Sequence, residues 1–117
     1  SGKVPIDRLA LGVPYEHESN LLRKRVKPNV RCAGDVWFVP YETVQDGSDR
    51  GHHPATFPVE LARRCIQLAG VKKGTVVLDP FVGIGSTLSA CQKLGVKAVG
   101  IDIDAAYCRE ARKRLGL

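Results

Sequence analysis

Five residues in the C-terminal half have types and spacing that suit the binding of a nucleotide-like ligand. Asp79, Phe81, Gly83 and Gly85 lie in the run VVLDPFVGIGST at 76–87, and Asp102 follows 17 residues after Gly85. Glycines let the backbone approach a ligand where a Cβ would intrude. A carboxylate accepts hydrogen bonds from ribose hydroxyls or binds an ammonium group, and an aromatic face attracts a nearby cation. These groups suit a ribose-containing ligand that carries positive charge.

The glycine spacing argues against a dinucleotide. A dinucleotide fingerprint requires a third Gly or Ala three residues after Gly85, where this chain has Leu88. Two acids and an aromatic ring around the turn favour S-adenosylmethionine, which carries an amino group, a sulfonium and a ribose. The alternative is that Gly83 and Gly85 form only a tight turn, with no ligand.

The regular part of the chain predicts the elements that must position these residues. Apolar strands are expected over 75–80 and 97–103, with helices over 58–70, 86–95 and 105–117. A strand, helix, strand order of this length predicts a right-handed βαβ unit with both strands buried. We therefore expect an α/β fold, a partial Rossmann-like doubly wound parallel sheet that is half of a larger fold. Ligands of such sheets bind beyond the carboxyl ends of the strands, the rim that carries Asp79 and Asp102.

The helix patterns also predict which side chains face the core. The helix over 58–70 is expected to bury Leu61, Ala62, Cys65, Ile66, Leu68 and Ala69. The closing helix is expected to turn Tyr107, Ala111 and Leu115 inward. The four cysteines have no C-x-x-C pair, which argues against zinc, and are expected to be reduced thiols.

Composition and charge set wider limits. Hydrophobic residues make up 44% of the 117 residues and charged residues 26%, as in one soluble domain, and no apolar run is long enough to span a membrane. Residues 1–51 are expected to be irregular, with one strand near 35–41, and the chain divides there from the regular part at 52–117. The net charge is +6. Its densest cluster is expected to contact nucleic-acid phosphates or, alternatively, only solvent: Arg23, Lys24, Arg25, Lys27 and Arg31.

Two segments together resemble the amino DNA methyltransferases, which methylate adenine N6 or cytosine N4. LDPFVGIGSTLSACQKLGVKAVGIDIDAAYCREARKRL is similar to their S-adenosylmethionine-binding region, and GHHPATFPVELARRCIQLAG to their His-Pro segment. The order of segments resembles the β group, and the resemblance covers about residues 33–117. Bacteria and phages use these enzymes in restriction and modification, so the resemblance implies a cytoplasmic protein.

The resemblance also assigns roles. It implies that Phe81, Gly83, Gly85 and Asp102 hold S-adenosylmethionine, with Asp79 near its methionine part. In the His-Pro segment, His53, Thr56 and Phe57 would approach the methionine end, although His53 alternatively packs on the sheet. The basic cluster would close the target-recognition region and contact DNA.

One family motif is absent from the sequence. These enzymes hold the flipped base with an (Asp/Asn/Ser)-Pro-Pro-(Tyr/Phe/Trp) motif, and the chain contains none, so no catalytic residue is assigned. The chain is therefore expected to be a split subunit or a piece of a longer enzyme, inactive alone. Its open sheet edge would pair with a complementary half or with a second copy. Two alternatives are a non-catalytic module that binds S-adenosylmethionine or DNA, and a nucleotide-cofactor fragment of a dehydrogenase.

Overall fold

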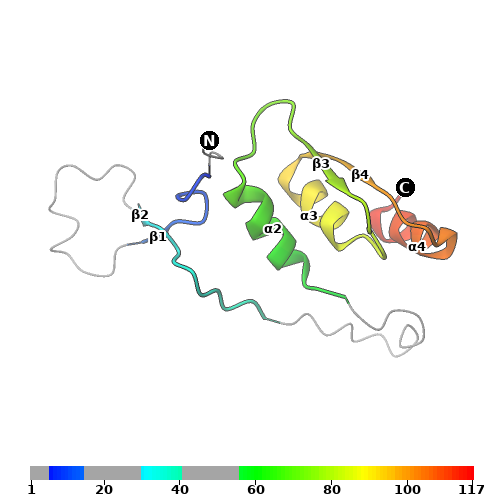
Figure 1. Ribbon diagram of the computed structural model, residues 1–117, viewed down its shortest axis with the longest axis horizontal. Helices are drawn as coiled ribbons and strands as arrows, with labels where there is room; N and C mark the ends of the chain where they lie inside the picture. Colours follow the sequence, from blue (N-terminus) through cyan, green and yellow to red (C-terminus); the bar gives the residue numbers. More distant parts are fainter. Residues whose placement is uncertain (1–5, 15–29, 41–55) are drawn as a thin grey trace, which may run out of the picture.

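A computed structural model of the chain describes residues 6–14, 30–40 and 56–117 (Figure 1). Its regular part holds three helices and a parallel pair of strands, in the order predicted from the sequence. They are α2 (Val59–Leu68), β3 (Val76–Asp79), α3 (Ser86–Leu94), β4 (Lys97–Gly100) and α4 (Ala105–Leu115). The partial parallel α/β fold is confirmed. Among the described residues, no helix is long and apolar enough to cross a membrane.

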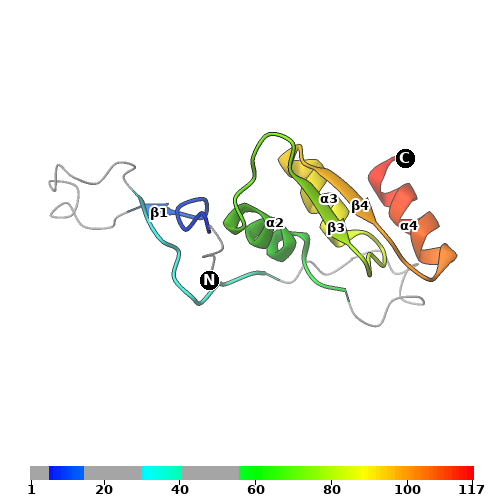
Figure 2. The ribbon, with the colours of Figure 1, turned by 45° about the horizontal axis from the view of Figure 1, so that its top comes forward.

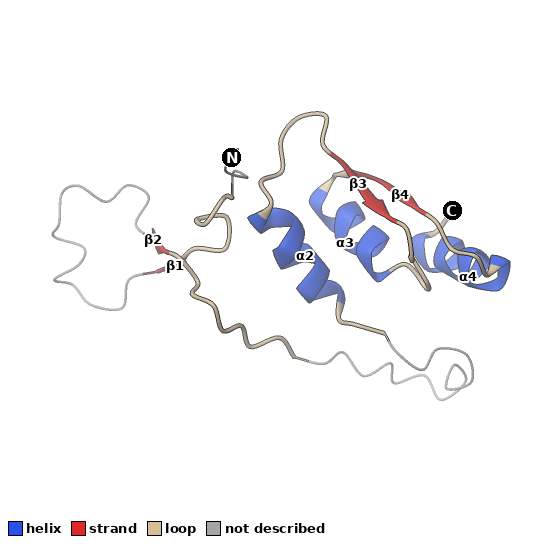
Figure 3. Cartoon of the chain, in the orientation of Figure 1, coloured by secondary structure: helices blue, strands red, loops and turns tan. Residues whose placement is uncertain are grey.

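The two strands run parallel and α3 connects them. Val76 pairs with Lys97 and Asp79 with Gly100, so both strands end at the same rim. Figure 3 shows all three helices on one side of this sheet. The core forms where α2 meets α3, because Val59 and Ala62 of α2 pack with Ala90 of α3.

The expectation that both strands are buried is wrong. Alternate residues on the face away from the helices are about half exposed: Val76 (56%), Leu78 (62%), Val99 (49%) and Ile101 (53%). Side chains alternate between the two faces of a strand, and the described residues supply a helical layer for only one face. The strands are apolar, as predicted, but within the described residues no layer packs on the second face of the sheet.

The predicted inner face of α2 is also only partly right. Ala62 is buried and Ile66 packs against the core, whereas Leu61, Cys65 and Ala69 are exposed. The neighbouring helix α3 covers a narrower stripe of α2 than the apolar face that the pattern predicted. In α4 the prediction is closer, since Ala111 is buried and Tyr107 and Leu115 are half-buried.

The N-terminal segments contribute only a minimal sheet. Strands β1 (Val13–Pro14) and β2 (Val30–Arg31) form an antiparallel pair, and the Asp7 amide donates to the Leu68 carbonyl at the end of α2 (2.9 Å). The strand predicted near 35–41 is wrong over its described part, because 35–40 pairs with no strand there. A strand requires a hydrogen-bonding neighbour, which the apolar alternation of this segment could not reveal. The proposed division near residue 52 lies outside the described residues.

Candidate functional site

The carboxyl-end rim of the sheet brings Asp102 to the glycine turn. Asp102 follows β4, and its Oδ2 accepts a hydrogen bond from the Gly83 amide at 2.8 Å. Its Oδ1 accepts one from the Asp104 amide at 2.9 Å. The Val82 amide donates to the Ile101 carbonyl at 2.9 Å, so backbone and side chain both tie the turn to the end of β4. Residues 19 positions apart thus form one site.

Asp79 shapes the start of the same turn. Its Oδ1 accepts a hydrogen bond from the Phe81 amide at 3.0 Å, and its carbonyl accepts one from the Ile101 amide at 2.9 Å. The carboxylate therefore lies at the end of β3, on the rim where Asp102 ends β4. Burial raises the pKa of the Cys91 thiol on α3, and the nearby charge of Asp79 raises this pKa further.

The chemistry of the rim fits S-adenosylmethionine. A carboxylate such as that of Asp102 can accept about four hydrogen bonds, and ribose hydroxyls are suitable donors. Phe81 is 87% exposed, and Ile103, between the two acids that follow β4, is fully exposed. Acids and exposed apolar side chains side by side suit a ligand with a cationic part and an adenosine part.

The two predicted glycines have different surroundings. Both have positive φ, 51° at Gly83 and 87° at Gly85. Gly85 is buried, and a Cβ built on it would lie 3.1 Å from the Cβ of Ala111 in α4. The absence of a side chain at Gly85 therefore lets α4 pack closely against the turn. Helix packing thus gives a second reason for glycine at this position, besides the predicted approach of a ligand.

Sequence reasoning assigned no role to two residues that hold the rim together. A Cβ on Gly100 would lie 2.7 Å from Val82 Cγ2, so only glycine lets the turn pack on β4. Asp104 caps α4, because its Oδ1 accepts from the Ala106 amide at 2.7 Å. A glycine inside a strand pattern and an acid just before a helix were the available signals.

The structure describes only some of the other predicted site residues. Thr56 and Phe57 precede α2, whose N-terminal end lies at the same end of the sheet as the glycine turn (Figures 1 and 2). Phe57 is exposed and Thr56 is half-buried. Arg31 lies in β2, apart from this rim. The remaining predicted residues lie outside the described part: His53, Arg23, Lys24, Arg25 and Lys27.

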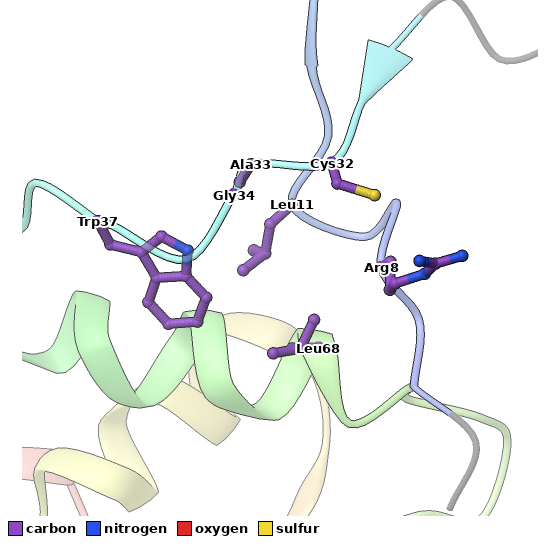
Figure 4. A pocket seen from close by; sticks show the side chains of 7 residues that line it. All are labelled: Arg8, Leu11, Cys32, Ala33, Gly34, Trp37 and Leu68. Atoms are coloured by element: carbon purple, nitrogen blue, oxygen red, sulfur yellow. The ribbon is translucent and has the colours of Figure 1, made fainter. Parts of the chain in front are cut away.

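A pocket elsewhere in the chain is separate from this site. Figure 4 shows it between the N-terminal segments and the C-terminal end of α2, where Leu11 and Trp37 face Leu68 and Arg8 lies at the side. Its lining is mostly apolar and holds no acid. Among the described residues, none of those predicted to bind the cofactor lines it.

Comparison with known proteins defines the class of the chain. The model of the N6/N4 DNA methylase family matches residues 2–113. The chain is 45% identical over 92 residues to the type II methyltransferase M.SmaI of Serratia marcescens, covering 79% of this chain and 28% of that one. It is 33% identical over 110 residues to the type II methyltransferase M.HpaI of Haemophilus parainfluenzae, covering 94% and 32%.

A solved structure agrees with these relatives. The crystal structure of the M1.HpyAVI complex with S-adenosylmethionine matches with a TM-score of 0.50 and 32% identity, over 56% of this chain and 32% of that one. That protein binds the cofactor that the sequence predicts here. The chain belongs to the N6/N4 DNA methylase family. It spans about a third of the length of the relatives it matches.

Proposed function

We propose that this chain is the cofactor-binding part of an amino DNA methyltransferase. The complete enzyme would transfer a methyl group from S-adenosylmethionine to adenine N6 or cytosine N4. The observation that carries the proposal is the hydrogen bond from the Gly83 amide to Asp102, which joins the acid after β4 to the glycine turn after β3. The family match and the cofactor-bound relative support the same assignment.

Each rim residue has a role in this proposal. Asp102 accepts the ribose hydroxyls while its backbone bonds keep the carboxylate oriented. Phe81, Gly83 and Gly85 form the turn beside the cofactor, and Asp79 faces its cationic methionine part. His53, Thr56 and Phe57 approach the methionine end. The cofactor supplies the methyl group, and these residues bind and orient it.

A second polypeptide, or a further part of the same enzyme, supplies the base pocket in this proposal. The (Asp/Asn/Ser)-Pro-Pro-aromatic motif is absent from the 117 residues, so the chain has no group assigned to hold an extruded base. The exposed face formed by Val76, Leu78, Val99 and Ile101 supports such a partner, because parallel sheets are normally covered on both faces. A second copy of the chain at the open edge is the alternative.

The experiment is a tritiated methyl-transfer assay with duplex DNA. The chain alone should give no turnover, since methyl transfer requires both reactants held in line. Activity should appear when a polypeptide carrying the missing motif is added. A copy of that polypeptide with the motif's aromatic residue changed to Ala is the matched control.

Each result decides between the candidates. Turnover by this chain alone would contradict the two-part proposal. Cofactor binding that never yields turnover with any motif-bearing partner would instead support the non-catalytic module, which the missing motif favours. Binding of NAD in preference to S-adenosylmethionine in a titration would support the dehydrogenase fragment.

A further inference from the structure

Seven exposed cations lie at or beside the amino end of the sheet, away from the cofactor rim. We call this set the basic end: Lys72, Lys73, Lys93, Lys97, Arg112, Lys113 and Arg114. They come from three segments, 71–75, 92–97 and 111–117, which contain no acidic residue and no aromatic residue. The acids of the described rim lie at the other end of the strands.

Specific contacts bring the three segments together. Lys97 begins β4 and pairs with Val76 of β3, four residues after Lys72. The α2–β3 turn is held by hydrogen bonds between Lys72 and Thr75, at 2.9 and 3.0 Å. The last turn of α4 joins α3 through Gln92, whose Nε2 donates to the Leu115 carbonyl at 3.2 Å. Figures 1 and 2 show the α2–β3 loop beside the α3–β4 connection.

None of these seven cations forms an ion pair in the described part of the chain. By contrast, Arg63 and Arg64 of α2 are both paired with Glu60. Helix dipoles favour cations in the last turns of α3 and α4, which accounts for Lys93 and Arg112 to Arg114. Lys72, Lys73 and Lys97 lie in no helix, so the dipole does not account for them.

We infer that the basic end binds the phosphate backbone of duplex DNA without reading its sequence. Lys and Arg at this density neutralise several phosphates and release counterions. Single strands are usually held by aromatic side chains that stack on bases, and these segments contain none, which favours a duplex. The contact lies at the end of the sheet opposite the cofactor rim, so it engages DNA away from the target base. The choice of DNA as the polyanion rests on the proposed function.

Fluorescence anisotropy with a labelled duplex of random sequence tests the inference on the 117-residue chain. Two double variants remove two charges each from the basic end: Arg112→Gln with Lys113→Gln, and Lys72→Gln with Lys73→Gln. The matched control, Arg63→Gln with Arg64→Gln, removes two cations that are already paired. Raising the salt from about 50 to 200 mM weakens DNA binding by some factor. This factor should become about three- to fourfold smaller for each phosphate contact removed.

Both basic-end variants should flatten the salt dependence, and the control should match the parent chain. Equal slopes for all four proteins would overturn the inference, as would binding to anionic lipid vesicles but not to DNA. Calorimetry with S-adenosylmethionine separates the two proposals. If the variants flatten the salt dependence but the chain binds no S-adenosylmethionine, the DNA contact at the basic end stands and the proposed function is wrong.

Discussion

The two ends of the β3–β4 sheet carry opposite charge, although the same elements build both. At the carboxyl end, Asp79 and Asp102 bond to the glycine turn and Asp104 caps α4, and at the amino end lie the seven cations of the basic end. Parallel strands place the N-termini of α3 and α4 at the first end and their C-termini toward the second. Helix dipoles favour acids at N-termini and cations at C-termini. Helix dipoles therefore explain part of the charge at each end, but not Lys72, Lys73 and Lys97, and matched variants are needed to separate function from this structural effect.

The largest expected effect comes from the glycines that flank α3, one toward each end of the sheet. Gly85 and Gly95 both have positive φ, 87° and 67°. A Cβ at Gly85 meets Ala111 at 3.1 Å, whereas nothing lies within 4 Å of one at Gly95. Gly85→Val should lower the free energy of unfolding by about 2–5 kcal/mol, the sum of left-handed strain and overpacking. Urea unfolding of the variant and the parent chain measures this loss of stability.

Gly95→Val is the control for this prediction. It carries the left-handed strain without the clash, so it should cost only about 1–2 kcal/mol. Equal losses at the two positions would mean that α4 yields to the added side chain, and that the packing of Gly85 on Ala111 does not constrain the rim.

The next effect concerns the acid that links the strand end to the turn. Asp102→Ala removes the acceptor of the Gly83 and Asp104 amides. S-adenosylmethionine affinity should fall by about 1.5–3 kcal/mol, the scale of hydrogen bonds to a charged group. Isothermal titration calorimetry measures the affinity.

Asp104→Ala provides the comparison at the same rim. It removes the cap of α4 and should cost about 1 kcal/mol of stability while leaving cofactor affinity nearly unchanged. If both variants bind the cofactor like the parent, the ribose assignment of Asp102 is wrong and the carboxyl-end acids serve helix capping and turn structure alone.

The smallest effect is a pH dependence in the first turn of α2. Hydrogen bonds from Arg63 and Arg64 lower the pKa of Glu60 from 4.5 to about 2. Because the pKa is lower in the folded state, the charged Glu60 side chain contributes its full stabilisation above about pH 4.5. This contribution is lost as the pH falls toward 2. Glu60→Gln should cost about 1 kcal/mol or less at neutral pH, since the pairs are partly exposed.

Urea unfolding of the parent chain and the Glu60→Gln variant at several pH values tests this. The difference between them should shrink below about pH 4.5. A difference that stays constant down to about pH 2 would show that the glutamate acts through packing rather than charge. The control is Asp7→Asn, which changes an acid outside the helix. The Asp7 side chain accepts hydrogen bonds from two loop amides.

Local pattern predicted the elements well because local physics forms them. The i, i+3, i+4 spacing of α2, and the glycines that end α3 and α4, encode helices wherever the chain packs. The strand predicted near 35–41 failed over its described part, because Val36 and Phe38 alternate like a strand but no described strand pairs with them. Whether a segment forms a strand depends on a neighbouring strand to pair with, and the sequence of the segment itself does not reveal one.

The sequence by itself determined the cofactor class and the residues of the rim. Acids, an aromatic residue and two glycines at strand ends suit S-adenosylmethionine, and parallel strands bring their carboxyl ends together. Only the tertiary structure decided that Asp102 accepts from the Gly83 amide, that Gly85 packs on Ala111, and that one sheet face is exposed. The physical reason is distance in the chain. Contacts between residues 19 or 26 positions apart, such as Gly83 with Asp102 and Gly85 with Ala111, depend on how α3 and α4 pack on the sheet. Burial of a strand depends on neighbouring layers that the strand cannot specify.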